Sequence, residues 1–177
     1  MSEQQQQRDR MSDYDIDKIA ERLTQSEWLR FELQAYFRYR AKALAPLCES
    51  PIELKLLTAI DFNMNLVADT VITFRIGQAG SDPLIGLAEP CLVIVPQYPW
   101  RDFRIDFAVF AAPGRHAQVF IECDGHAFHE RTPQQAEYDR RRDRLVQEAG
   151  IPILRFTGRE IYRDPFDCAA QVVNFIW

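Results

Sequence analysis

The chain has 177 residues, 47% of them hydrophobic and 12% aromatic, which suits one globular domain with a sizeable core. Its net charge of −5 is not that of a nucleic-acid coat protein, although it does not exclude a nuclease, because phosphate contact depends on where the basic residues lie. No apolar run approaches the roughly 20 residues that span a bilayer, and the polar N-terminus resembles no signal peptide, so we expect a soluble, cytoplasmic protein without a membrane partner.

The N-terminal third is predicted to be helical after a short tail. Residues 1–12 are rich in Gln and charge, which is typical of a disordered tail. From residue 13 to residue 47, apolar side chains interleaved with charges predict one long or two shorter amphipathic helices, which end at Pro46. We expect this N-terminal helical extension to precede a single domain over residues 48–177.

A new helix is predicted to begin at residue 51. Ser50 is placed as its N-cap, Pro51 in its first turn and Glu53 in the capping-box position. The capping role alone is a sufficient explanation for Glu53. Residues 63–89 then combine an apolar alternation with a Gly/Ser/Asp/Pro loop, and predict a strand or hairpin with its connection.

The remaining elements predict an α/β fold. Apolar runs predict strands over residues 90–96, 103–111 and 117–123, with the last two pairing antiparallel through a turn at Pro113 and Gly114. After them come an arginine-rich helix over 133–149 that ends at Gly150, a short buried strand over 151–156 and one last helix. This order of elements predicts a mixed central sheet flanked by helices.

Acidic residues interrupt two of these apolar runs. Asp106 lies in one predicted strand and Glu122 in the next, with Asp124 two residues further on. A buried carboxylate requires a partner, which is a metal ion, an arginine or a substrate proton. Adjacent antiparallel strands allow Asp106 and Glu122 to converge on one face if the register permits, and Glu122 and Asp124 share a face by the period of two.

The converging acids indicate a hard divalent cation. Carboxylates at one position repel each other unless a cation lies between them. Oxygen ligands favour Mg²⁺ or Mn²⁺ over zinc. Other interpretations remain open at this point: Asp106 pairs with Arg104 or Arg155, or His126 and His129 form half of a zinc site.

The order and content of four segments resemble a known family. SPIELKLL, PQYPWRDFRIDFAVF, VFIECDGHAFH and EYDRRRDRLVQEAGIPILRF follow one another over residues 49–157. Together they resemble the PD-(D/E)XK nuclease superfamily, and within it bacterial domains related to the very-short-patch mismatch repair endonucleases. The resemblance implies a restriction-endonuclease-like αβββαβ core with an added N-terminal helical region. Residues 63–89 are longer than the family's usual connection, so the resemblance implies an insertion there.

The resemblance also implies a site and a reaction. It assigns metal binding to Asp106, Glu122 and the Cys123 carbonyl, and places Glu53 beside them as a supporting acid. The implied reaction is phosphodiester hydrolysis with Mg²⁺ or Mn²⁺, in which Asp124 or His129 steers the attacking water or accepts its proton. The resemblance also implies that Gln97 and Arg142 contact the substrate phosphate.

One departure from the family pattern bears on catalysis. The superfamily carries a lysine two residues after the strand acid, and here that residue is Asp124. We therefore expect a metal-dependent endonuclease acting on DNA in repair, restriction or mobile-element biology. A catalytically inactive module that binds nucleic acid or protein is the alternative, and an RNA-directed or toxin-like nuclease is a third. A homodimer or a partner protein is left open.

Overall fold

The computed structural model describes residues 23–67, 73–80, 91–111, 117–125 and 132–176. Internal contacts divide the chain into two units, residues 1–40 and 41–177, and each unit is described by itself. The tail predicted over residues 1–12 lies outside the described residues, as does the first part of the predicted N-terminal helices.

Helix α3, Glu27–Leu44, makes up most of the described first unit and continues into the second. The hydroxyl of Ser26 accepts a hydrogen bond from the N–H of Leu29 at 3.4 Å, which satisfies one donor of the first turn. The short 3-10 turn η1, Ala45–Leu47, follows directly and contains Pro46. Since proline donates no main-chain hydrogen bond, the helix ends here, as the sequence predicts.

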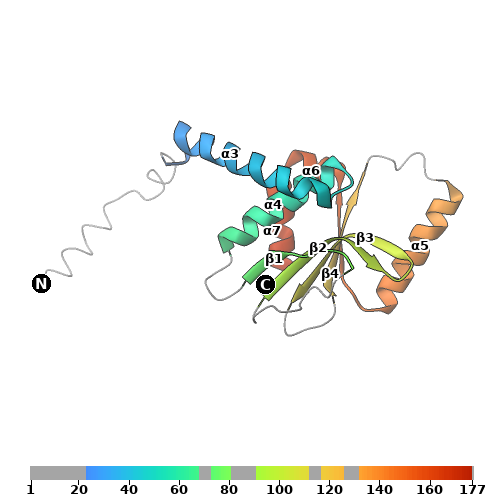
Figure 1. Ribbon diagram of the computed structural model, residues 1–177. Coiled ribbons are helices and arrows are strands. Elements are labelled where there is room, and N and C mark those ends of the chain that lie inside the picture. Colours follow the sequence, from blue (N-terminus) through green and yellow to red (C-terminus); the bar gives the residue numbers. More distant parts are fainter. Residues whose placement is uncertain (1–22, 68–72, 81–90, 112–116, 126–131, 177) are drawn as a thin grey trace, which may run out of the picture. The chain divides into compact units, whose positions relative to one another are not determined.

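The second unit is built on a five-stranded mixed sheet with the strand order β1-β2-β3-β4-β5 (Figure 1). Strand β2 pairs antiparallel with β3, and β3 with β4, whereas β1 and β5 run parallel to their neighbours. The predicted α/β class and the predicted antiparallel pair are confirmed. The strands are β1, Thr73–Ile76; β2, Cys91–Trp100; β3, Phe103–Ala111; β4, Ala117–Asp124; and β5, Ile153–Thr157.

Helices cover both faces of this sheet (Figure 1). On one face lie α4, Pro51–Val67, α6, Gly158–Arg163, and α7, Pro165–Ile176. Helix α5, Pro133–Glu148, lies on the other. The first core joins α4 and α7 to side chains such as Phe107 and Ile121, and the second core joins Val146 of α5 to Phe110 and Phe120.

Two predicted boundaries are wrong for reasons of backbone chemistry. The single last helix is two helices, because Pro165 begins α7 and Asp164 Oδ1 caps it, accepting the N–H groups of Phe166 and Asp167 at 3.0 Å each. Strand β2 extends to Trp100, beyond the predicted end at residue 96. It tolerates its two prolines because β1 has ended by then and β2 has a strand on one side only.

The range predicted as an insertion, 63–89, contributes in part to the core. Helix α4 continues to Val67, and β1 adds an edge strand to the sheet. Gly77 follows β1 and its N–H donates to the Ile94 carbonyl at 2.8 Å. A side chain at Gly77 would meet Val93 Cγ1 at 2.9 Å, so glycine allows this segment to approach β2 closely.

Strands β2 and β3 interrupt their regular alternation at the same level. Their register pairs Pro96 with Phe107 and Tyr98 with Ile105. Phe107 packs in the first core and Ile105 in the second, although residues two apart on a regular strand share a face. Both strands therefore change face at the intervening position. On β3 this position is Asp106. On β2 it is Gln97, whose backbone is in the left-handed conformation with φ of 50°.

Candidate functional site

Asp106 lies at this change of face, next to strand β4. The β3–β4 register pairs Phe107 with Ile121, so Asp106 is across from Glu122. The main-chain N–H of Cys123 donates a hydrogen bond to Asp106 Oδ2 at 2.7 Å. Burial raises the pKa of the Asp106 carboxyl to about 6; the hydrogen bond from Cys123 opposes this rise and the nearby Glu53 adds to it.

Glu122 is a buried acid with one satisfied oxygen and one unsatisfied oxygen. Its residue exposure is 5%, and Arg142 Nη1 of helix α5 lies 2.8 Å from Glu122 Oε2. The other oxygen, Oε1, is buried and has no hydrogen-bond partner among the residues that the structure describes. Burial raises the pKa of Glu122 to about 7, with the Arg142 guanidinium opposing the rise and Asp106 adding to it. This is the environment in which a carboxylate gains most from a cation.

Arg142 brings a largely buried guanidinium to the acids. Its side chain is 14% exposed. In the part of the chain that the structure describes, its Nε is buried without a hydrogen-bond partner, with Asp143 Oδ1 3.9 Å away. The alternative partners considered for Asp106 are not its ion-pair partners: Arg104 pairs with Glu49 and Arg155 with Asp143. The arginine at the acid site is therefore Arg142.

Glu53 caps its helix and also faces the site. The N–H of Glu53 donates to Ser50 Oγ at 3.3 Å, as the predicted N-cap requires. The Glu53 carboxylate accepts the Ser50 hydroxyl through Oε1 at 2.6 Å, whereas a capping box uses the Ser50 main-chain N–H. Glu53 Oε2 accepts the N–H of Glu49 at 2.8 Å and Gln97 Nε2 at 2.7 Å. Since its charge raises the pKa of Asp106, Glu53 lies close to the strand acids as well.

The structure brings most of the sequence-predicted residues together. Asp124 ends β4, and its charge raises the pKa of both Asp106 and Glu122. Gln97 contacts Glu53, and Arg142 contacts Glu122. His129, like His126, lies outside the described residues, so its predicted role is not addressed by the structure.

Two cysteines lie near the acids, and sequence reasoning gave neither thiol a place at this site. Burial, with smaller contributions from the charges of Glu53 and Asp106, raises the pKa of Cys48 to about 12. Burial also raises the pKa of the Cys123 thiol, with Asp106 as the next contribution. Both thiols therefore stay protonated at neutral pH. The signal in the sequence was the position of Cys48, two residues before the cap at Ser50.

The donor set suits a hard divalent cation, although the acids are not arranged as a complete ligand cage. Within the described ranges, no group of three or more His, Cys, Asp or Glu side chains is arranged to hold a metal ion. Mg²⁺ needs fewer protein ligands than this, because it keeps several waters and takes one or two carboxylates. The unpartnered Glu122 Oε1, with Asp106 across from it, fits that smaller requirement.

No helix in the described part of the chain is long and apolar enough to cross a membrane. The chain has no significant match among curated proteins or among solved structures. The family model REase_MTES_1575 matches residues 87–176, just over half of the chain, from the start of β2 through α7. The matched range contains Asp106, Glu122, Asp124 and Arg142, together with the sheet that positions them. The chain therefore belongs to the restriction-endonuclease-like family REase_MTES_1575 and carries a nuclease-like domain.

Proposed function

We propose that the protein is a metal-dependent endonuclease that hydrolyses phosphodiester bonds in DNA with a site of the PD-(D/E)XK type. One observation carries the proposal: Glu122 is buried across from Asp106, and within the described ranges its Oε1 has no hydrogen-bond partner. A fold that required only a structural ion pair would not bury a second, unsatisfied carboxylate oxygen, because that oxygen costs free energy. The membership in a restriction-endonuclease-like family supports the same conclusion.

The proposed metal is Mg²⁺ or Mn²⁺, held by Asp106, Glu122 and the Cys123 carbonyl. When bound, such an ion polarises the phosphate and lowers the pKa of a bound water. The N–H of Cys123 keeps the Asp106 carboxylate in place. Glu53 is a positioning residue that does not contact the substrate: its carboxylate accepts hydrogen bonds from Gln97 and from the N–H of Glu49 just before α4, and so holds both in place.

The proton and phosphate steps are assigned to the remaining residues. Asp124, or His129 from outside the described ranges, accepts the proton of the attacking water. Arg142 is the cation nearest to the strand acids, and its guanidinium is suited to a phosphate oxygen. The superfamily lysine has no counterpart at position 124, and the described Lys55 lies elsewhere, with its Nζ 4.4 Å from the centroid of the Tyr162 ring. We therefore assign the cationic role to Arg142.

We propose DNA repair, restriction or a mobile element as the setting of this activity, on the basis of the resemblance to very-short-patch mismatch repair endonucleases. These settings differ in the substrate that is cut. A mismatch in a duplex is the substrate expected for repair, and an unmodified duplex for restriction. A homodimer or a partner protein would extend the contact with DNA along the duplex.

A cleavage panel tests the proposal. Purified protein is incubated with single-stranded, duplex, mismatched and branched DNA and with RNA, in Mg²⁺, Mn²⁺ or EDTA. We expect metal-dependent cutting of DNA, at least 100-fold slower by order of magnitude in Asp106→Asn and Glu122→Gln, because each removes a charge on which the metal and transition state depend. Asp61→Asn is the matched control, since Asp61 is a buried acid of α4 with 2% exposure. Undiminished cutting by both site variants contradicts the assignment.

The Glu122–Arg142 ion pair favours a second candidate, a catalytically inactive module that binds nucleic acid or protein. In that case Arg142 neutralises the acid permanently, and no metal is required. Binding of DNA without cutting, and no binding of Mg²⁺ or Mn²⁺ in calorimetry, would select this candidate. Metal-dependent cutting of RNA with no cutting of DNA would select the RNA-directed or toxin-like nuclease instead.

A further inference from the structure

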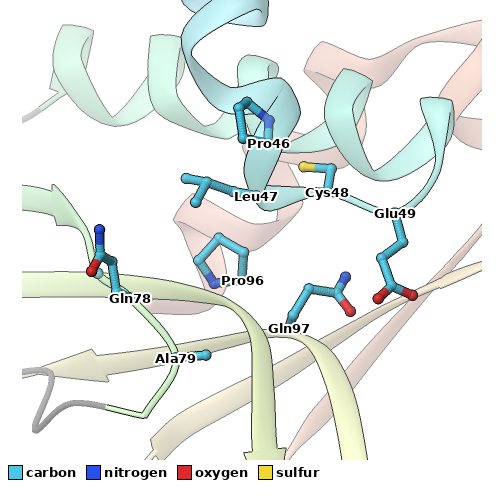
Figure 2. A pocket seen from close by; sticks show the side chains of 9 residues that line it. Pro46, Leu47, Cys48, Glu49, Gln78, Ala79, Pro96 and Gln97 are labelled. Atoms are coloured by element: carbon cyan, nitrogen blue, oxygen red, sulfur yellow. The ribbon is translucent and has the colours of Figure 1, made fainter.

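A pocket of about 380 Å³ opens beside the acid site, between the start of α4 and the loop after β1. Figure 2 shows Glu49 and Gln97 on one side of this pocket and Gln78 on the other, with Leu47 and Pro96 between them. Its volume is within the roughly 300–1,000 Å³ typical of small-molecule sites. The lining is completed by Pro46, Cys48, Gly77 and Ala79.

Three lining residues connect this pocket to the acids. Gln97 Nε2 donates to Glu53 Oε2 at 2.7 Å, and the main-chain N–H of Glu49 donates to the same oxygen at 2.8 Å. The charges of Glu53 and Asp106 both raise the pKa of Cys48. A group in this pocket would therefore be next to a phosphate that reached Asp106 and Glu122.

The lining selects the chemistry of the ligand. No described lining residue is Lys or Arg, and Glu49 carries a negative charge, so the pocket does not suit a phosphate. The proline rings and Leu47 offer apolar surface to a flat ring. Gln97 has used one amide N–H on Glu53 and retains a second N–H and its carbonyl oxygen. Glu49 keeps acceptor capacity beside its ion pair with Arg104.

We propose that this pocket binds one nucleobase of the substrate, adjacent to the bond that is cut, and prefers a base with an exocyclic amine. The amine donates to the Glu49 carboxylate, whereas thymine offers a carbonyl and a methyl group at the corresponding edge. The Gln97 amide hydrogen-bonds to the remaining polar groups of the base. Because Gln97 also donates to Glu53, it connects recognition of the base to the proposed metal-binding acids. The placement beside a cleaved bond rests on the proposed nuclease function; the binding of a base does not.

Nucleoside binding tests the pocket without any cleavage. Saturation-transfer NMR is recorded on the full chain with 2′-deoxyadenosine, 2′-deoxycytidine and thymidine. We expect transfer to the two amine-bearing nucleosides and roughly tenfold weaker binding of thymidine. Ala79→Phe places a ring in the pocket from an exposed loop and should abolish transfer. Gln147→Ala, an exposed position of α5 outside this pocket, should leave it unchanged.

A selectivity variant sharpens the test. Glu49→Gln supplies an amide that donates to a thymine carbonyl, so discrimination against thymidine should fall by roughly tenfold. Absence of transfer to wild-type protein, or equal transfer to wild type and Ala79→Phe, overturns the pocket proposal. If nucleosides bind but no nucleic acid is cut, the nuclease function fails and the pocket stands. If DNA is cut with the same base preference by wild type and Ala79→Phe, the pocket proposal fails and the nuclease stands.

Discussion

Arg142 Nη1 lies 2.8 Å from Glu122 Oε2, and this ion pair fastens helix α5 to strand β4. Both side chains are largely buried, at 14% and 6% exposure. Removing one partner of a buried ion pair leaves an uncompensated charge, which costs about 3–5 kcal/mol. Glu122 can escape part of this cost by taking up a proton, because burial has already raised its pKa to about 7.

Arg142→Met should therefore destabilise the protein in a pH-dependent way. At pH 8 we expect the free energy of unfolding to fall by about 3 kcal/mol, and at pH 5 by clearly less, because Glu122 is then protonated. Urea denaturation at the two pH values measures the difference. The double variant Arg142→Met/Glu122→Gln should recover most of the loss at pH 8. An equal loss at both pH values would show that packing, not charge, dominates.

The left-handed backbone at Gln97 makes a second prediction. Its φ of 50° is unfavourable for a residue with a Cβ, by about 1–2 kcal/mol, and free of cost for glycine. Gln97→Gly and Gln97→Ala both lose the hydrogen bond to Glu53, but only the first relieves the backbone. We expect the glycine variant to be more stable than the alanine variant by about 1 kcal/mol in urea denaturation. Arg101, with φ of 54°, lies in a turn away from the acids and serves as the control. Arg101→Gly should likewise be more stable than Arg101→Ala, because the same backbone conformation is relieved.

The sequence predicted the acids more completely than the path that brings them together. Asp106 and Glu122 were identifiable because a carboxylate in an apolar strand is costly, and their antiparallel pairing followed from the turn between the strands. The change of face at Gln97 and Asp106 was not predicted. Pro96 stands directly before Gln97, but a proline does not specify a left-handed backbone for the residue after it, and on β3 the flanking Ile105 and Phe107 are both apolar. The split at Asp164 and Pro165 was readable, and was missed because the apolar residues of α6 and α7 continue one helical period.

Other parts depended on tertiary context. The resemblance alone singled out Arg142 among several arginines on a polar helix, and the packing of α5 on the sheet is what brings it to Glu122. The pocket beside Glu53 joins residues from three separate segments, so no local pattern indicates it. Glu53 was readable both as a cap and as a site acid, and the structure shows contacts of both kinds.

These two roles of Glu53 can be separated by substitution. Glu53→Gln keeps a side chain that suits the third position of a capping box, so we expect a change in stability of less than about 1 kcal/mol. Its lost charge should lower the pKa of Asp106, because Glu53 raises that pKa, and should weaken metal-dependent cleavage. Ser50→Ala is the converse variant: it should cost about 1 kcal/mol and leave cleavage largely intact. Equal cleavage by wild type and Glu53→Gln would restrict Glu53 to capping.

The raised pKa values of Asp106 and Glu122 predict how stability depends on pH. In the folded protein these pKa values are about 6 and about 7, above ordinary carboxyl values near 4, so the folded state binds more protons in this window. Their contribution to the free energy of unfolding is therefore present below about pH 4 and is lost as pH rises towards 7. Comparison with Asp106→Asn/Glu122→Gln in urea denaturation isolates it, since that variant should show a smaller decline.

Metal binding should reverse the same trend. A divalent cation and protons compete for the two carboxylates, so Mg²⁺ or Mn²⁺ binds more tightly once both have ionised. We expect either ion to raise the melting temperature more at pH 8 than at pH 5, and EDTA to abolish the rise. NaCl at matched ionic strength controls for general screening of the acidic chain. A salt-like rise that is independent of pH and persists in Asp106→Asn/Glu122→Gln would contradict specific binding.

Substitution of Asp124 is expected to alter the rate of DNA cleavage and its dependence on pH. It stands where the resembled superfamily carries a lysine, and its negative charge raises the pKa of both Asp106 and Glu122. Asp124→Lys replaces that charge with a cation, so it should lower both pKa values and shift the rise of cleavage with pH towards more acidic conditions. Asp124→Asn removes the charge without adding a cation, and separates the two effects.

If Asp124 accepts the proton of the water, both variants cut more slowly than wild type; if a cation is what the position lacks, Asp124→Lys alone cuts faster. Initial rates of DNA cleavage across pH 5 to 9 distinguish these outcomes.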